Sequence, residues 1–328
     1  MKLDGWIPIR VYWREDEREP RLDWCLIGET RFMDPFFDAT IQRRLSHPFH
    51  HAFRRETTIA ELLDWQASHT GVAPKGFIFH MSRCGSTLAA QMLAAIGQNI
   101  VLSEAAPLDS VLRAHLRGAS IADEERVAWF RAMVGALGQR RSAAEEHLFV
   151  KFDCWNIAEL PIVRLAFPDV PWIFLYRNPL EVLASHLRTP GGWTFPAVLP
   201  PAALGLQPEL SQLSHHEYLV RALARICELA LAHLPRHGGL PVNYLQLPDA
   251  AYSSLPGCFG ICYKDEDVNL MREAARNNAK MPGLPFEAGL EKRLPVAPPL
   301  RELAARWLDP LYRQLESSRA ANHQYALH

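Results

Sequence analysis

The chain has 328 residues, with 35 basic and 36 acidic side chains, so its formal net charge is −1 at pH 7. This balance excludes the strong basic excess of a nucleic-acid-binding protein, and we expect no nucleic-acid partner. No apolar run reaches the roughly 18 residues of a membrane span, and the first ten residues lack the apolar core of a signal peptide. We therefore expect no membrane partner and a cytoplasmic location.

Residues 1–72 carry a mixed pattern without a chemical motif. Residues 11–13 and 24–27 have the composition of short strands, and residues 58–69 that of a capped amphipathic helix. We expect this segment to be an α+β extension that packs against a core domain of residues 73–328. It would shape an acceptor pocket or provide the contact of a homodimer.

The most informative segment is residues 76–88, where an apolar strand ends at small and polar residues and a helical pattern follows. A strand, a tight loop and a helix N-terminus direct unpaired N–H groups and the positive end of the helix dipole at one point. Such a point binds phosphate or sulfate. The segment therefore predicts an anion-binding loop formed by Ser82, Arg83, Cys84, Gly85, Ser86 and Thr87.

A Walker A loop is a poor match, because it needs a lysine directly after its last glycine and here Ser86 follows Gly85. Residues 82–88 instead resemble the 5′-phosphosulfate loop of the sulfotransferases. Those enzymes use PAPS (3′-phosphoadenosine 5′-phosphosulfate) as donor and release PAP. Cys84 stands where serine or glycine is more usual. The alternative interpretation of the loop is an ordinary helix N-cap.

A second strand–helix segment, residues 171–185, resembles the 3′-phosphate motif of the same superfamily. Arg177 ends the strand, Pro179 opens the helix, and Ser185 lies two turns along it. The resemblance implies that Arg177 and Ser185 bind one phosphate together, the arginine gripping its oxygens in pairs. A strand-end arginine and a buried helix serine without a ligand are the alternative.

Strands and helices alternate from residue 73 onward. We expect strands at 76–81, 99–103, 147–152, 172–177 and 240–245, and helices at 86–97, 107–117, 122–141, 156–167, 179–188, 212–234 and 299–320. Such alternation is typical of a parallel sheet between two helix layers. Together with the two motifs it predicts a three-layer α/β/α, P-loop-like sulfotransferase fold. Residues 189–210 form a long loop of the kind that often serves as a lid.

The resemblance also implies catalytic roles for Arg83, Glu104 and Lys151. Sulfuryl transfer resembles phosphoryl transfer, in which charge develops on the transferred and leaving oxygens. Arg83 and Lys151 would stabilise that charge, with Asp153 as the expected partner of Lys151. Glu104 follows the strand after the loop helix, as the proposed base of the tyrosylprotein sulfotransferase branch does. It would accept the acceptor's proton if burial raises its pKa towards neutrality.

Other roles are open for the same region. Glu104 is also placed to stabilise the start of the next helix, and Lys151 is also a plausible strand-end lysine with an exposed ammonium. His80 and His186 are the competing bases, because many cytosolic sulfotransferases use histidine. The pair Cys258 and Cys262 lacks a second pair of ligands, so we expect no metal site.

The sequence thus predicts a PAPS-dependent sulfotransferase that acts without a metal. Its acceptor would be a hydroxyl or amine of a small molecule or peptide. A P-loop kinase using ATP is the alternative enzyme, and a catalytically silent nucleotide-binding protein with the same fold is the alternative outside enzymes.

Overall fold

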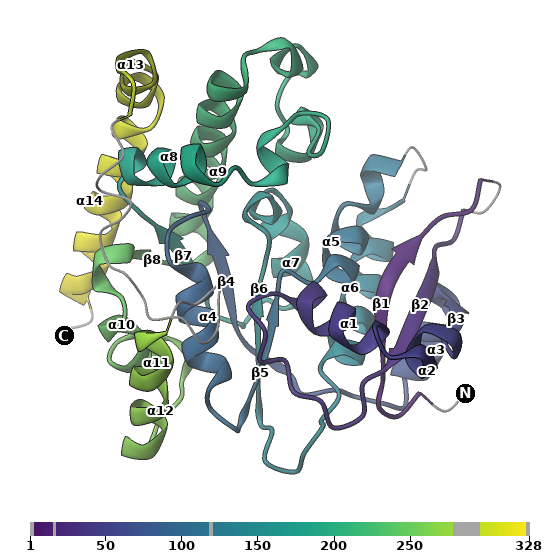
Figure 1. Cartoon of the computed structure of the whole chain (residues 1–328). Coiled ribbons are helices and arrows are strands. Elements are labelled where there is room, and N and C mark those ends of the chain that lie inside the picture. Colours follow the sequence, from purple (N-terminus) through teal and green to yellow (C-terminus); the bar gives the residue numbers. More distant parts are fainter. Residues whose placement is uncertain (1–2, 16–17, 118–120, 278–295, 326–328) are drawn as a thin grey trace.

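The computed structural model describes residues 3–15, 18–117, 121–277 and 296–325, and it contains two separate sheets (Figure 1). The larger has five strands in the order β5–β6–β4–β7–β8, and each neighbouring pair is parallel. Its strands are β4 (Pro74–His80), β5 (Asn99–Ser103), β6 (His147–Lys151), β7 (Trp172–Tyr176) and β8 (Leu240–Asn243).

The central strand β4 explains why the sequence shows an unbroken apolar run there. It pairs with β6 on one edge and β7 on the other, and helices cover both of its faces. Phe77, Ile78 and Phe79 are consequently all fully buried, although they alternate between the two faces.

Helices lie on both sides of this sheet, as the α/β/α prediction requires. Crossovers between parallel strands are almost always right-handed, which places α4 on one face and α6 and α7 on the other. Helix α4 packs with α12, and α6 packs with α7. The helices of this part are α4 (Ser86–Ala94), α5 (Ala106–Leu112), α6 (Asp123–Leu137), α7 (Leu160–Ala166), α8 (Pro179–Arg188), α9 (His215–His237), α10 (Asp249–Tyr252), α11 (Leu255–Phe259) and α12 (Asp265–Arg276). None of the helices in the described ranges has the length and apolarity needed to cross a membrane.

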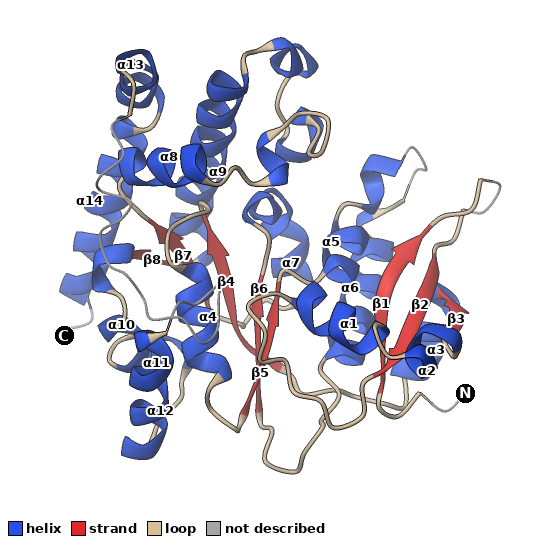
Figure 2. Cartoon of the chain, in the orientation of Figure 1, coloured by secondary structure: helices blue, strands red, loops and turns tan. Residues whose placement is uncertain are grey.

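The smaller sheet is antiparallel and belongs to the N-terminal part (Figure 2). Its elements are β1 (Trp6–Tyr12), β2 (Arg21–Leu26), α1 (Phe37–Leu45), α2 (Pro48–Ala52), β3 (Arg55–Thr58) and α3 (Ile59–Gln66). A capping box of Thr58 and Glu61 begins α3. Strand β1 packs against α5 and helix α3 against α6, so this sheet is attached to the helix layer of the core.

The structure corrects the predicted C-terminal helix 299–320, which is two helices, α13 (Pro298–Trp307) and α14 (Asp309–Tyr325). Pro310 cannot donate a hydrogen bond to the carbonyl of Arg306 and disfavours helical geometry at the residue before it.

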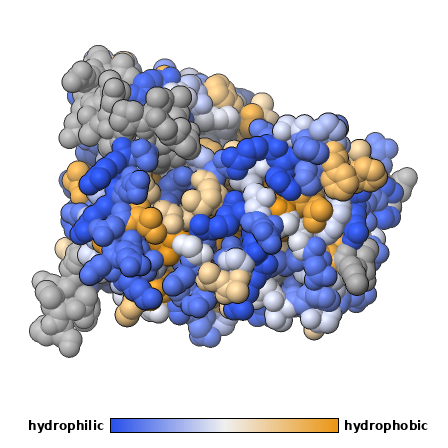
Figure 3. Space-filling model, turned by 60° about the horizontal axis from the view of Figure 1, so that its bottom comes forward, coloured by the Kyte–Doolittle hydropathy of each residue, from blue (hydrophilic) through white to orange (hydrophobic). Residues whose placement is uncertain are grey.

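The predicted loop 189–210 contains short 3₁₀ turns at Gly192–Thr194, Pro201–Leu204 and Pro208–Gln212. Seen from below, the surface is mostly hydrophilic, with small separate apolar areas (Figure 3).

The segment that leads into β4 packs too closely on α6 to accept a side chain at Gly71. A Cβ there would lie 2.2 Å from the Gly135 carbonyl oxygen. We predict that Gly71→Ala lowers the free energy of unfolding by about 1–3 kcal/mol, as overpacking does. Gly97→Ala is the matched control, because its Cβ would meet nothing within 4 Å. Urea unfolding tests this, and equal stability of the two variants would show that the close contact does not matter.

Candidate active site

The parallel sheet gathers the predicted site residues at one edge, because ligands of such sheets bind beyond the carboxyl ends of the strands. The anion-binding loop follows β4, Glu104 follows β5, Lys151 ends β6, and Arg177 follows β7. Strand β6 lies between β5 and β4, and Lys151 pairs in register with Ser103 on one side and Ile78 on the other. Lys151 is therefore placed between Glu104 and the loop.

The loop has the backbone of an anion-binding turn. Ser82, Arg83 and Gly85 have φ values of 73°, 51° and 84°, in the left-handed region that non-glycine residues rarely adopt. Gly85 is the N-cap of α4 and has no side chain with which to cap it. The first N–H groups of α4 therefore receive no hydrogen bond from an N-cap side chain. Ser82, Arg83, Ser86 and Thr87 line a cavity of about 180 Å³, the loop cavity.

Gly85 has a second reason to be glycine, because Tyr244 packs directly against it. A Cβ at Gly85 would lie 2.7 Å from the Tyr244 ring and 3.0 Å from Leu247. Arg177 also packs on Tyr244, and its guanidinium carbon lies 4.1 Å from the centre of the Tyr244 ring. Tyr244 therefore supports the loop and the arginine together.

Cys84 does not present its thiol to the loop cavity. The side chain is fully buried, and its Sγ donates to the Leu175 carbonyl oxygen at 3.1 Å. Burial raises the pKa of this thiol to about 11. Cys84 can therefore contribute only its backbone N–H to a ligand in the loop. Its side chain is small because strand β7 lies directly behind it.

Lys151 and Glu104 form the central ion pair of the site. Lys151 is fully buried, and its ammonium donates to Glu104 Oε1. The backbone N–H of Glu104 donates to the Lys151 carbonyl oxygen at 2.7 Å, and Glu104 has a φ of 54°. The expectation that Asp153 pairs with Lys151 is wrong. The left-handed turn at Glu104 brings the glutamate to the lysine instead.

The pKa of Glu104 is shifted in the direction opposite to the one expected from the sequence. Burial alone raises it, but the Lys151 charge and a hydrogen bond from His80 outweigh burial and lower the pKa to about 2. In this arrangement Glu104 is ionised and weakly basic. Its basicity depends on where the Lys151 ammonium is.

His80 is held as a neutral ring with both nitrogens engaged. Its Nδ1 accepts from the Ser82 N–H at 3.0 Å, so Nε2 carries the proton and lies 3.0 Å from the Phe152 carbonyl oxygen. Nε2 is also 3.4 Å from Glu104 Oε1. Burial lowers the pKa of His80. The nitrogen that would accept a proton is thus occupied by the loop backbone, which argues against His80 as the base. His186 is buried against Trp193, their ring centres 5.5 Å apart.

The two arginines lie on either side of the loop. Arg83 reaches the end of α8, where its guanidinium donates to the Thr189 carbonyl oxygen. Arg177 is buried, and its Nε donates to Glu181 Oε2 at 2.7 Å. Ser185 is buried two turns along α8. That Arg177 and Ser185 bind one phosphate stays a prediction.

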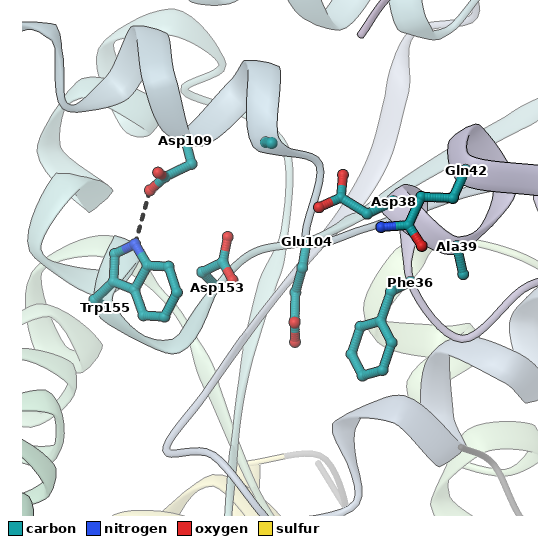
Figure 4. Close-up of a pocket in the computed structure, with 9 residues that line it drawn as sticks. Phe36, Asp38, Ala39, Gln42, Glu104, Asp109, Asp153 and Trp155 are labelled. Atoms are coloured by element: carbon teal, nitrogen blue, oxygen red, sulfur yellow. Dashed lines mark hydrogen bonds between the residues drawn. The ribbon is translucent and has the colours of Figure 1, made fainter. Parts of the chain in front are cut away.

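A second, larger cavity of about 470 Å³ adjoins the loop cavity (Figure 4). The two cavities share a wall formed by Phe36, Glu104, Asp153 and Trp155. The larger one, which we call the acceptor cavity, is also lined by Asp38 and Gln42 of α1 and by Asp109 of α5. Glu104 therefore lies at the junction between an anion-binding loop and a space large enough for a small molecule.

Most of the acceptor-cavity residues are not predicted by the sequence. Asp153 and Trp155 follow β6 directly, so the strand-end rule that found Lys151 extends to them. No comparable signal marks Phe36, Asp38 and Gln42, which reach the cavity from α1 and the residue before it.

No family model matches the sequence, and no curated protein matches it. The structure is similar to a sulfotransferase from Alicyclobacillus acidocaldarius (13% identity, TM-score 0.44, covering 76% of this chain and 96% of that chain). It is also similar to the sulfotransferase domain from the curacin biosynthetic pathway (14%, TM-score 0.46, covering 72% and 98%) and to a sulfotransferase from Mycobacterium avium (14%, TM-score 0.44, covering 83% of each).

The Lys151–Glu104 pair makes a prediction about stability. Glu104→Gln leaves the Lys151 ammonium buried without a negative partner, which costs about 3 kcal/mol for a buried pair. Adding Lys151→Met removes the charge, and we expect the double variant to regain most of that loss. Urea unfolding of the two single variants and the double variant measures the coupling. Additive losses in the double variant would contradict the pairing.

Proposed function

We propose that this protein transfers a sulfuryl group from PAPS to a hydroxyl or amine of an acceptor. The observation that carries the proposal is the position of Glu104, which lines both the loop cavity and the acceptor cavity. A carboxylate at such a junction is placed to accept the proton of a nucleophile that attacks a group held in the loop.

The loop cavity fits the phosphosulfate end of the donor. Its walls include Arg83, Ser86 and Thr87, and the N-terminus of α4 faces it. These are the groups that bind sulfate and phosphate oxygens. A volume of about 180 Å³ suits that end alone, and the adenosine would extend over Tyr244 and Arg177. PAPS supplies an activated sulfuryl group, so no metal is needed to create one.

Lys151 gives this arrangement a way to prepare its base. In the described structure the ammonium neutralises Glu104 and keeps its pKa low. A negative group in the loop cavity would compete with Glu104 for the same ammonium. As Lys151 turns towards that group, burial raises the pKa of Glu104 because its compensating charge is weakened. The base thus becomes stronger when the donor is present.

Each residue then has one task in the transfer. Glu104 accepts the proton of the acceptor's hydroxyl or amine as that atom bonds to sulfur. Lys151 stabilises the sulfuryl oxygens. Arg83 and the first N–H groups of α4 stabilise the charge that remains on the phosphate oxygen when its bond to sulfur breaks.

A kinase reaction is less well supported, because the lysine that a Walker A loop uses on the terminal phosphates is replaced by Ser86. A silent binding protein is less well supported because Glu104 is held at a φ of 54° beside Lys151. Strained residues of this kind gather at functional sites.

The 3′-phosphate of the nucleotide provides the test. We predict that PAP binds more tightly than AMP, which lacks that phosphate, and that Arg177→Ala weakens PAP binding by about 30-fold, or about 2 kcal/mol. Arg236→Ala removes the same side chain from an exposed position in the last turn of α9 and should leave PAP binding unchanged. Isothermal titration calorimetry measures the dissociation constants of PAP and AMP for the unmodified protein, and of PAP for the two variants.

Equal affinities for PAP and AMP would contradict a 3′-phosphate site. Tighter binding of ATP with magnesium than of PAP would favour the kinase reaction instead.

A further inference from the structure

The acceptor cavity contains more carboxylates than nearby cations neutralise. Asp109 is fully engaged, with Arg113 Nε and Trp155 Nε1 each 2.7 Å from its Oδ1. Glu104 is paired with Lys151. Asp38 and Asp153 also line the cavity, and neither forms an ion pair with any other residue of the described ranges. Two carboxylates of the cavity wall thus lack a positive partner.

The surroundings of these two carboxylates make their ionised forms less favourable than in water. Asp38 is exposed at the rim of the cavity, but partial desolvation of its carboxyl and the charge of Glu104 raise its pKa. Burial, Glu104 and Asp109 raise the pKa of Asp153 well above its usual range, and Lys151 and Arg113 offset only part of this effect. A positive charge placed in the cavity would relieve both carboxylates at once.

Two aromatic rings complete the environment of a cation. Phe36 lies on one side of the cavity and Trp155 on the other, and the hydrogen bond from Trp155 to Asp109 fixes the indole (Figure 4). Both rings already lie beside cations, with Lys151 Nζ 5.4 Å from the Phe36 centroid and the Arg113 guanidinium carbon 5.8 Å from that of Trp155. Aromatic faces attract ammonium groups, and this attraction grows when water is excluded.

The geometry relates this environment to the proposed base. Figure 4 shows Glu104 between Asp153 and Asp38. A molecule held by one of these carboxylates through a positive group therefore has the rest of its length beside Glu104. A volume of about 470 Å³ is within the usual range for a small-molecule site.

We infer that the acceptor is a small cationic molecule, an amine-bearing alcohol, phenol or polyamine, whose ammonium group is bound by Asp38 and Asp153 between Phe36 and Trp155. This inference rests on the sulfuryl transfer proposed above and names the substrate class of the same site. An anionic acceptor, such as an acidic sugar or acidic peptide, would meet unpaired carboxylates and is disfavoured.

Three phenols of similar size but different charge test the inference. Tyramine carries an ammonium group, 4-ethylphenol is neutral, and 4-hydroxyphenylacetate is anionic. Their dissociation constants are measured by ligand-observed NMR, with and without saturating PAP, and sulfation of each is then followed with PAPS. We expect tyramine to bind about tenfold or more tightly than 4-ethylphenol, and the anion to bind most weakly.

Asp38 supplies the matched variants. It is exposed at the rim of the cavity in the first turn of α1, so Asp38→Asn should fold. We expect this variant to lose at least about fivefold of the tyramine preference over 4-ethylphenol while its affinity for 4-ethylphenol stays the same. Asp64→Asn makes the same charge change at an exposed position of α3 and should keep the full preference. Asp153→Asn should lower the preference for tyramine over 4-ethylphenol in the same way as Asp38→Asn.

The outcomes separate this inference from the proposed function. Three results would overturn the cationic acceptor: equal binding of the three phenols, tighter binding of the anion, or no detectable binding of tyramine at about 10 mM. In each case PAP binding would be unaffected. Failure of PAP to bind, with tyramine still preferred in the nucleotide-free protein, would instead overturn sulfuryl transfer and leave a cation-binding cavity.

Discussion

Lys151 ends a strand inside the parallel sheet with no exposed surface, so its ammonium needs a negative partner within the protein. Glu104 provides that partner from the end of the neighbouring strand, through a left-handed backbone turn and a backbone hydrogen bond to Lys151 itself. His80 contacts the same carboxylate and also holds the Ser82 N–H of the loop. One ion pair thus connects the anion-binding loop, the candidate base and the wall of the acceptor cavity.

This connection has a chemical consequence. A carboxylate with a pKa of about 2 is a poor base, and it stays so while the ammonium remains beside it. Under the proposed function, a negatively charged donor in the loop would compete for that ammonium, so donor binding and the strength of the base would be coupled through a single charge. In the acceptor cavity, Asp38 and Asp153 have no cationic partner among the described residues, which is the basis for inferring a cationic acceptor.

The sequence was sufficient to predict the sheet and the sheet edge at which Arg83, Glu104, Lys151 and Arg177 lie, because periodicity and strand ends are local properties. It predicted the helices that connect the strands but not α10, α11 and α12, and it merged α13 and α14 into one helix. It was insufficient for the partner of Lys151, which depends on the φ of Glu104 rather than on residue spacing. The direction of the Cys84 thiol depends on β7, which is distant in sequence. The acceptor cavity needed the packing of α1 beside the core, and no motif in residues 1–72 encodes that contact.

The pKa of Glu104 tests the coupling most directly. Carbon-13 NMR titration of the labelled carboxylates, with the Glu104 signal assigned from its loss in Glu104→Gln, gives this pKa in the free protein and with PAPS bound in the absence of acceptor. We predict a pKa of about 2 in the free protein and a higher one with PAPS, because Lys151 then turns towards the donor. A pKa that stays the same or falls when PAPS binds would contradict the transfer of the Lys151 charge from base to donor.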